Sequence, residues 1–213
     1  MAIKGIVHSG ASEERFEKLI KERLRPGADK VTIDERIWDL FEEEWCIMFT
    51  DLSGFSRNVA EFGIIHFLQT KYESERILIP VLDDYDGILL KVEGDSLLVI
   101  FKRPQKALKA AITMQQKCLE YNADKHDEEK ILLCVGLGYG RVLKIGDSDV
   151  FGAEVNASSK LGEDTANAWE ILITQSVKDN IEESGDLSFE KLEKAPPGAK
   201  AAYRVLYDIN KKI

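Results

Sequence analysis

Cysteine and histidine are scarce in this sequence of 213 residues, which contains three of each. The cysteines are odd in number and form no Cys-x-x-Cys pair, which argues against a disulfide framework and against a zinc site. The histidines fit no metal-ligand spacing, so any bound metal would be a hard cation with oxygen ligands. The six residues are Cys46, Cys118, Cys134, His8, His66 and His126. This composition predicts a reduced, cytoplasmic protein.

Long apolar runs and an excess of positive charge are also missing. No apolar stretch approaches the roughly 20 residues that a membrane helix needs, and the stretch MAIKGIVHSGASEERF lacks the apolar centre of a secretory signal. The formal net charge is -9, with 38 acidic against 29 basic side chains. Nucleic-acid-binding surfaces need a basic stripe, so we expect neither nucleic acid nor a membrane as a partner. A small anionic substrate would need local cations.

Two short amphipathic helices are predicted near the N-terminus. Apolar residues recur at helical spacing over residues 12–24, where Ser12 can cap the first turn and the sequence RPGAD ends the helix. A second helical pattern covers residues 32–43. We therefore expect an N-terminal helical extension over residues 1–43, which packs on the following domain or on a second copy of the chain.

The remainder, residues 44–213, alternates strand and helix patterns. A buried strand, a long helix, a hairpin, a second helix and a glycine-containing strand give the βαββαβ order of a ferredoxin-like core. A further helix and three strands follow them. The ranges are 46–50, 58–82, 87–101, 104–121 and 131–145 for the core, then 152–163, 171–174, 189–192 and 203–206. We therefore predict an α+β fold with additional C-terminal strands.

Two carboxylates mark one end of the predicted sheet. Asp51 directly follows the first strand in FTDLSGF, and Asp95 lies at the hairpin tip in KVEGDSLLVIF. Because the first and third strands of a βαββαβ sheet are central neighbours, both acids would lie at the same edge. Such a pair suits two Mg²⁺ or Mn²⁺ ions, because magnesium prefers one or two carboxylates together with substrate phosphates. Taken singly, each acid is equally well explained by a helix cap or an ordinary turn.

Three ordered motifs carry a resemblance to a known family. They are FTDLSGF, KVEGDSLLVIF and DVFGAEVNASSKL. The chain from about Cys46 to Thr174 resembles the catalytic domain of the class III nucleotidyl cyclases, the adenylyl and guanylyl cyclases. The resemblance implies a phosphorus-oxygen lyase with the βαββαβ core described above.

The resemblance also implies a metal site and a phosphate contact. Asp51, Leu52 and Asp95 would hold two magnesium ions. One ion would activate the ribose 3'-hydroxyl, and both would neutralise the triphosphate while the α-phosphorus is attacked and pyrophosphate leaves. Gly54 and Phe55 lie between a strand and a helix, where backbone amides would bind the triphosphate substrate.

Base recognition is implied position by position. Lys91 matches the lysine that adenylyl cyclases use toward the adenine ring, and Asp149 matches the aspartate that accepts a hydrogen bond from the adenine 6-amino group. Both imply ATP as substrate and cyclic AMP as product. Without the resemblance, Lys91 would be a solvated strand residue and Asp149 a turn residue.

The implied catalytic residues include one departure from the family. Asn156 matches the asparagine that positions the ribose, and Lys160, four residues later on the same helix face, stands where the family has an arginine. Lysine keeps the charge but loses the bidentate fork, so stabilisation of the transferring phosphate would weaken. Arg141 matches a phosphate-contacting arginine of some cyclases, although a surface charge on a strand explains it equally well. A late phosphate-contacting lysine would be Lys194 or Lys200.

The family builds each active site from two subunits, and this chain contains both sets of residues. The resemblance therefore implies a homodimer with two shared sites. Three functions stay open at this stage. The chain is an adenylyl cyclase, a cyclase acting on GTP or a pyrimidine nucleotide, or a nucleotide-binding regulatory homologue of low activity.

Overall fold

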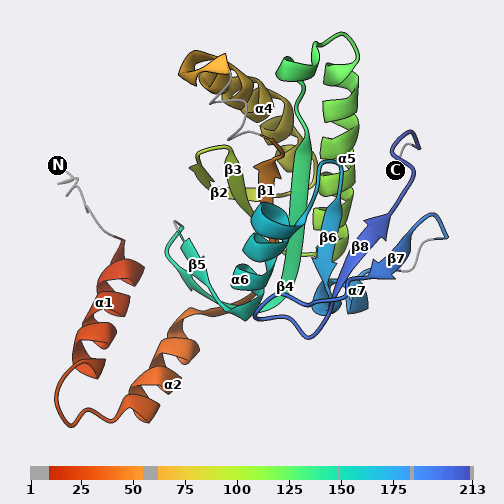
Figure 1. The fold of residues 1–213 in the computed structure, drawn as a ribbon. Helices are drawn as coiled ribbons and strands as arrows, with labels where there is room; N and C mark the ends of the chain where they lie inside the picture. Colours follow the sequence, from red (N-terminus) through yellow and green to blue (C-terminus); the bar gives the residue numbers. More distant parts are fainter. Residues whose placement is uncertain (1–9, 55–61, 148, 183–184, 212–213) are drawn as a thin grey trace, which may run out of the picture.

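The computed structural model describes residues 10–54, 62–147, 149–182 and 185–211. The core elements after the N-terminal helices are β1 (Glu42–Leu52), α4 (Ile64–Asp84), β2 (Ile88–Glu93), β3 (Ser96–Phe101), α5 (Pro104–Asn122) and β4 (Leu133–Ile145), with the short 3₁₀ helix η1 (Asp127–Glu129) between α5 and β4. The strands lie side by side in the order β2-β3-β1-β4, all antiparallel to their neighbours. The predicted ferredoxin-like βαββαβ core is therefore confirmed (Figure 1).

The C-terminal part of the chain extends this sheet. Its elements are β5 (Asp149–Phe151), α6 (Ala153–Ser159), the π-helical turn η2 (Lys160–Thr165), β6 (Ile171–Thr174), α7 (Gln175–Asp179), β7 (Ser188–Lys191) and β8 (Ala202–Leu206). The sheet continues from β4 through β6 and β8 to β7, while β5 pairs with the end of β4. The additional C-terminal strands are thus also confirmed.

The main core lies between the sheet and helices α4 and α5, which cover one of its faces (Figure 1). Met48 of β1 and Val99 of β3 are fully buried in the same cluster as Leu108 and Ile112 of α5. Burying each such side chain stabilises the folded state by about 1.5–3 kcal/mol relative to leaving it exposed to water. The period of two along the strands and the helical spacing along α5 determine which face of the sheet packs against α4 and α5. The helical segments α6 and η2 lie on the opposite face.

Glycines on β4 allow α6 and η2 to lie directly on that opposite face. A Cβ atom at Gly136 would collide with the carbonyl oxygen of Ser158 and the amide nitrogen of Gly162. One at Gly138 would collide with the carbonyl oxygen of Glu154. These collisions are with backbone atoms, which cannot move aside cheaply. The close backbone approach expected for this glycine-containing strand is therefore present.

Two helices, α1 (Ala11–Arg23) and α2 (Lys30–Phe41), precede the sheet and extend away from its main body (Figure 1). Asp29 caps α2 by accepting a hydrogen bond from the Thr32 amide. The two helices pack on each other and on the end of β4 through a small apolar cluster. Its buried members are Leu19, Ile33, Ile37, Phe41 and Ile145. Among the described residues, no helix combines the length and the apolar character that crossing a membrane requires.

The boundary between α2 and β1 differs from the sequence pattern. The predicted helix over 32–43 ends at Phe41, and β1 begins at Glu42 rather than at Cys46. Three consecutive glutamates form the start of the strand because they pair in register with β4. This backbone pairing outweighs the poor strand propensity of glutamate.

Candidate active site

The register between β1 and β3 brings Asp51 and the hairpin turn to the same edge of the sheet. Thr50 is paired with Leu97, so Asp51 lies opposite Ser96 at the start of β3. The Ser96 hydroxyl donates to Oδ1 of Asp51 at 3.4 Å, and the Leu97 amide donates to the Thr50 hydroxyl at 3.2 Å. The predicted meeting of Asp51 with Asp95 at this edge is present in the structure.

The two carboxyl groups are partly buried and lie close to each other, beside the backbone amide of Leu52. Burial raises the pKa of Asp51 to about 7, and the charges of Asp95 and then Glu163 add to the rise. Burial also raises the pKa of Asp95, with a smaller contribution from Glu163. Holding these acids together costs free energy, which a divalent cation between them would remove.

The donor atoms at this edge fit a magnesium or manganese ion. They are carboxylate oxygens, which hard cations prefer. In the described part of the chain, no three His, Cys, Asp or Glu side chains gather closely enough to enclose a metal ion by themselves. An incomplete protein cage suits magnesium, which commonly binds through one or two carboxylates plus substrate phosphates. Asp51 and Asp95, with the main chain of Leu52, would hold the ions.

The chain turns sharply after β1, beside these carboxylates. Ser53 donates its backbone amide to the Leu132 carbonyl at 2.8 Å. Gly54 follows with a φ of 79°, a left-handed conformation that glycine adopts without strain. Gly54, which we expected to contact phosphate, therefore lies next to the carboxylate edge. Phe55, expected there as well, lies outside the described residues.

The two residues expected to recognise the base contact each other. Nζ of Lys91 on β2 lies 2.6 Å from Oδ2 of Asp149 on β5, and this hydrogen bond raises the pKa of Lys91. Both line a hollow of about 170 Å³, to which Ser96 also contributes. The apolar walls of the hollow come from Phe49, Leu98, Val150 and Val155. Because Ser96 lines the hollow and also donates to Asp51, the hollow adjoins the carboxylate edge.

Asn156 and Lys160 lie on the two elements that flank this hollow, α6 and η2. The Asn156 side chain donates to the Pro197 carbonyl at 3.0 Å, and Nζ of Lys160 lies 2.5 Å from Oδ2 of Asp164. Both residues are exposed. The predicted helix over 152–163 is present, but it is an α-helix only as far as Ser159 and continues as a π-helical turn from Lys160. Such turns are frequent at functional sites.

Arg141 lies far from the carboxylate edge within one chain. Along β4 it stands about seven residues from the position opposite Asp51, a separation of roughly 20 Å at 3.3 Å per residue. Its guanidinium pairs with Glu42 and lies 5.2 Å from the ring centre of Trp38. A phosphate contact by Arg141 stays a prediction, which a second chain would have to satisfy.

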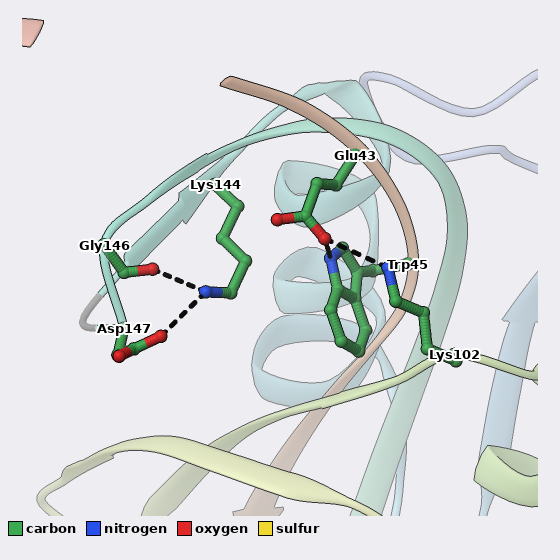
Figure 2. A network of polar contacts seen from close by, with 6 residues as sticks. All are labelled: Glu43, Trp45, Lys102, Lys144, Gly146 and Asp147. Carbon is green, nitrogen blue, oxygen red and sulfur yellow. Dashed lines mark hydrogen bonds and ion pairs between the residues drawn. The ribbon is translucent and has the colours of Figure 1, made fainter. Parts of the chain in front are cut away.

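The opposite end of β1 carries charges that are already paired (Figure 2). Oε2 of Glu43 accepts hydrogen bonds from Nε1 of Trp45 at 2.9 Å and from Nζ of Lys102 at 3.0 Å. Lys102 also lies 3.7 Å over the Trp45 ring, and Lys144 donates to the Gly146 carbonyl at 2.5 Å in the adjoining turn. Burial raises the pKa of Glu43, but the hydrogen bonds from Lys102 and Trp45 outweigh it and hold this pKa below its usual value.

The sequence pattern does not single out Ser96 or Glu163. Ser96 directly follows Asp95, so the antiparallel register alone would have indicated its contact with Asp51. Glu163 has no comparable signal, because its place beside the carboxylates depends on how η2 packs against β1 and β4.

A family model described as the adenylate and guanylate cyclase catalytic domain matches residues 41–201. The chain belongs to this family. The matched region begins at the last residue of α2 and includes every strand of the described structure except β8, which starts directly after it. The recognition made from the three sequence motifs is therefore confirmed.

Two curated relatives are each 27% identical to the cyclase domain. "Serine/threonine-protein kinase pkn2" of Myxococcus xanthus matches over 131 residues, which cover 62% of this chain and 16% of that protein. "Putative adenylate cyclase 3" of Rhizobium meliloti (strain 1021) matches over 145 residues, which cover 67% of this chain and 24% of that protein. The chain thus spans only a minor part of the length of either relative.

Solved structures of both adenylyl and guanylyl cyclases share the fold. The adenylyl cyclase CyaB from P. aeruginosa has a TM-score of 0.64 at 19% identity, covering 81% of this chain and 97% of its own. The guanylate cyclase domain of RhGC from Catenaria anguillulae in complex with GTP also has a TM-score of 0.64 at 19% identity, covering 78% and 98%. At these identities the likeness establishes the fold and leaves the substrate open.

Proposed function

We propose that this cyclase domain converts ATP to 3',5'-cyclic AMP and pyrophosphate with the help of two Mg²⁺ or Mn²⁺ ions. The observation that supports this most is the contact between Asp51 and Asp95 beside a hollow that contains the Lys91–Asp149 pair. The carboxylates suit divalent cations. The pair suits adenine, because Asp149 can accept from the 6-amino group while Lys91 donates to a ring nitrogen.

The chemistry divides between the ions and the side chains. Held by Asp51 and Asp95, the ions would supply activation of the 3'-hydroxyl and neutralisation of the triphosphate. The Asn156 amide would orient the ribose. Lys160 would donate to the transferring phosphate after it leaves Asp164, and this exchange costs little because the ion pair is exposed. The single ammonium offers a weaker contact than the arginine fork of the family.

A second copy of the chain would complete the site. The hollow of about 170 Å³ is smaller than the roughly 300–1,000 Å³ typical of small-molecule pockets. Exposed apolar side chains, Ile88 and Val92 on β2 and Phe151 on β5, belong to the strands that carry Lys91 and Asp149. Exposed apolar surface beside a site favours an interface, and a two-fold homodimer would create two equivalent sites.

A nucleotide panel tests this proposal. The full chain is incubated separately with ATP, GTP, CTP or UTP and Mg²⁺ or Mn²⁺, and the cyclic products are separated by chromatography. We expect cyclic AMP to form fastest, and Lys91→Glu to reduce turnover of ATP more than that of GTP. Faster cyclisation of GTP, CTP or UTP by the unmodified chain would show that the adenine assignment is wrong. Nucleotide binding without product would favour the regulatory homologue.

A further inference from the structure

The π-helical turn η2 places one further acid beside the carboxylate edge. Gly162 packs so closely on the sheet that a Cβ atom there would lie 2.7 Å from the Phe49 carbonyl oxygen and 3.0 Å from the Gly136 amide nitrogen. Phe49 stands two residues before Asp51 on β1. The side chain of the next residue, Glu163, therefore starts close to the end of that strand.

Contacts of the Glu163 side chain hold it at the site. It lines the hollow together with Ser96, and Ser96 in turn donates to Asp51. The Ser159 hydroxyl donates to Oε2 of Glu163, which restricts the position of the carboxylate. Glu163 of the π-helical turn thus lines a hollow whose wall, at Ser96, contacts the Asp51 carboxylate.

The neighbouring acid of the same turn, Asp164, is placed differently. Its side chain is 56% exposed and pairs with Lys160, so its charge is largely compensated. Glu163 is also exposed, but it forms no ion pair among the described residues and lines the hollow together with Ser96, the residue that contacts Asp51.

We propose that Glu163 is a third carboxylate of the cation site, which raises the affinity for divalent cations through its charge rather than by coordination. This inference rests on the proposed function, because it concerns the same metal site. An indirect role follows from the geometry, since the described residues form no cage of three metal-binding side chains. Because the Glu163 side chain is exposed, a solvent-like dielectric constant near 80 applies, and one negative charge about 6 Å from a divalent cation then changes its affinity by roughly tenfold.

Direct titration with Mn²⁺ alone tests this role without relying on activity. The full chain, free of nucleotide, is titrated at pH 8 and low ionic strength, and free Mn²⁺ is followed by electron paramagnetic resonance. We expect Glu163→Gln to weaken Mn²⁺ binding by roughly tenfold. Glu93→Gln is the matched control, because Glu93 lines the same hollow but lies 3.8 Å from Nζ of Lys91, which offsets its charge. This control should change the affinity by less than about twofold, since its charge is already compensated by that lysine.

Asp51→Asn separates this inference from the proposed function. If Asp51→Asn abolishes binding while Glu163→Gln binds as tightly as Glu93→Gln, the role of Glu163 is overturned and the metal site stands. If Asp51→Asn binds Mn²⁺ as tightly as the unmodified chain, the metal site itself is wrong.

Salt dependence distinguishes a field effect from coordination. The loss in Glu163→Gln should shrink in 0.5 M KCl, because salt screens a charge that acts at a distance. A loss that persists unchanged would overturn the indirect role. If Glu163→Gln does not fold, Ser159→Ala provides the test, because it keeps the charge but releases the carboxylate. We expect a loss of about twofold in that variant, and an unchanged affinity would count against the proposal.

Discussion

The two ends of β1 hold acidic side chains in opposite electrostatic states. At its start, Glu43 accepts hydrogen bonds from Trp45 and Lys102, which hold its pKa below the usual value despite burial (Figure 2). At its end, Asp51 faces Asp95, and burial together with these neighbouring charges raises its pKa to about 7. Both acids belong to one strand of one sheet. The difference is that Lys102 pairs with Glu43, whereas no cation among the described residues pairs with Asp51.

This comparison separates a residue that stabilises the fold from one that serves a ligand. A carboxylate with a protein cation beside it favours the folded state at neutral pH. Two buried carboxylates without one disfavour it, and such arrangements cluster where a ligand supplies the missing charge. The end of β1 that costs stability is therefore the end at which we place the two metal ions.

The largest expected effect is the loss of cyclase activity in Asp51→Asn. Removing one carboxylate should reduce product formation from ATP and Mn²⁺ by roughly 100-fold or more, because the charge stabilisation that the ions provide amounts to several kcal/mol. Glu43→Gln, the same chemical change at the other end of the strand, should leave the rate within about twofold. Equal losses in both variants would show that the two ends do not differ in function.

The second prediction concerns pH and stability without metal. The pKa of Asp51 rises from an ordinary 3.8 to about 7 on folding, so the folded state binds more protons between these values. The free energy of unfolding should therefore fall as pH rises through this window. We expect the free energy of unfolding to be about 1–3 kcal/mol lower at pH 8 than at pH 5, after allowance for solvent screening. Urea unfolding in EDTA at pH 5 and pH 8 measures it.

Asp51→Asn provides the control for this pH dependence. In this variant, the free energy of unfolding should depend much less on pH. At pH 8 the variant should be more stable than the unmodified chain. Unchanged slopes in the two proteins would mean that Asp51 is not the group responsible.

A smaller effect is expected at Lys160, the cation nearest in sequence to the proposed third carboxylate. Lys160→Arg should raise kcat by about three- to tenfold with KM nearly unchanged, because the guanidinium offers a bidentate contact to the transferring phosphate. Steady-state kinetics with ATP would measure both constants. A fall in kcat would indicate that the site is built around an ammonium group.

The smallest expected effect is the stability change in Glu43→Gln. Glutamine can still accept from Trp45 but loses the charged contact with Lys102, so we expect a loss of about 0.5–1 kcal/mol at pH 7. Because the pKa of Glu43 is lowered in the folded state, this contribution should disappear as pH falls through that pKa. Thermal unfolding at pH 7 and pH 3 tests this, and a stabilised variant at pH 7 would contradict it.

Much of the core was predictable because its local signals are strong. The apolar run before Asp51, the Gly94–Asp95 turn and the helical spacing after Pro104 each indicate one element. Their order permits few ways of pairing the strands, so the approach of Asp51 to Asp95 follows from topology. The extension of β1 back to Glu42 was not predictable, because its glutamates become strand residues only through pairing with β4.

The site was predictable only where strand order or family resemblance placed a residue. The contact between Lys91 and Asp149 joins β2 to β5, and neither residue has a local signal for it. The sequence pattern does not indicate the π-helical turn either, because this turn forms where Gly162 packs against β1. Arg141 lies away from the carboxylates for the same kind of reason, since its position along β4 is set by register.

The sequence by itself determined the order of the elements, the face that each strand buries and the edge where two acids meet, because hydrophobic periodicity and turn chemistry are local. Only the tertiary structure decided which charges have partners. Within the described part of the chain, Glu43 has a cation beside it and Asp51 has none, and Glu163 rather than Asp164 lines the hollow next to Ser96. The physical reason is that the energy of a charge depends on burial and on neighbours from distant segments, which spacing along the chain does not encode.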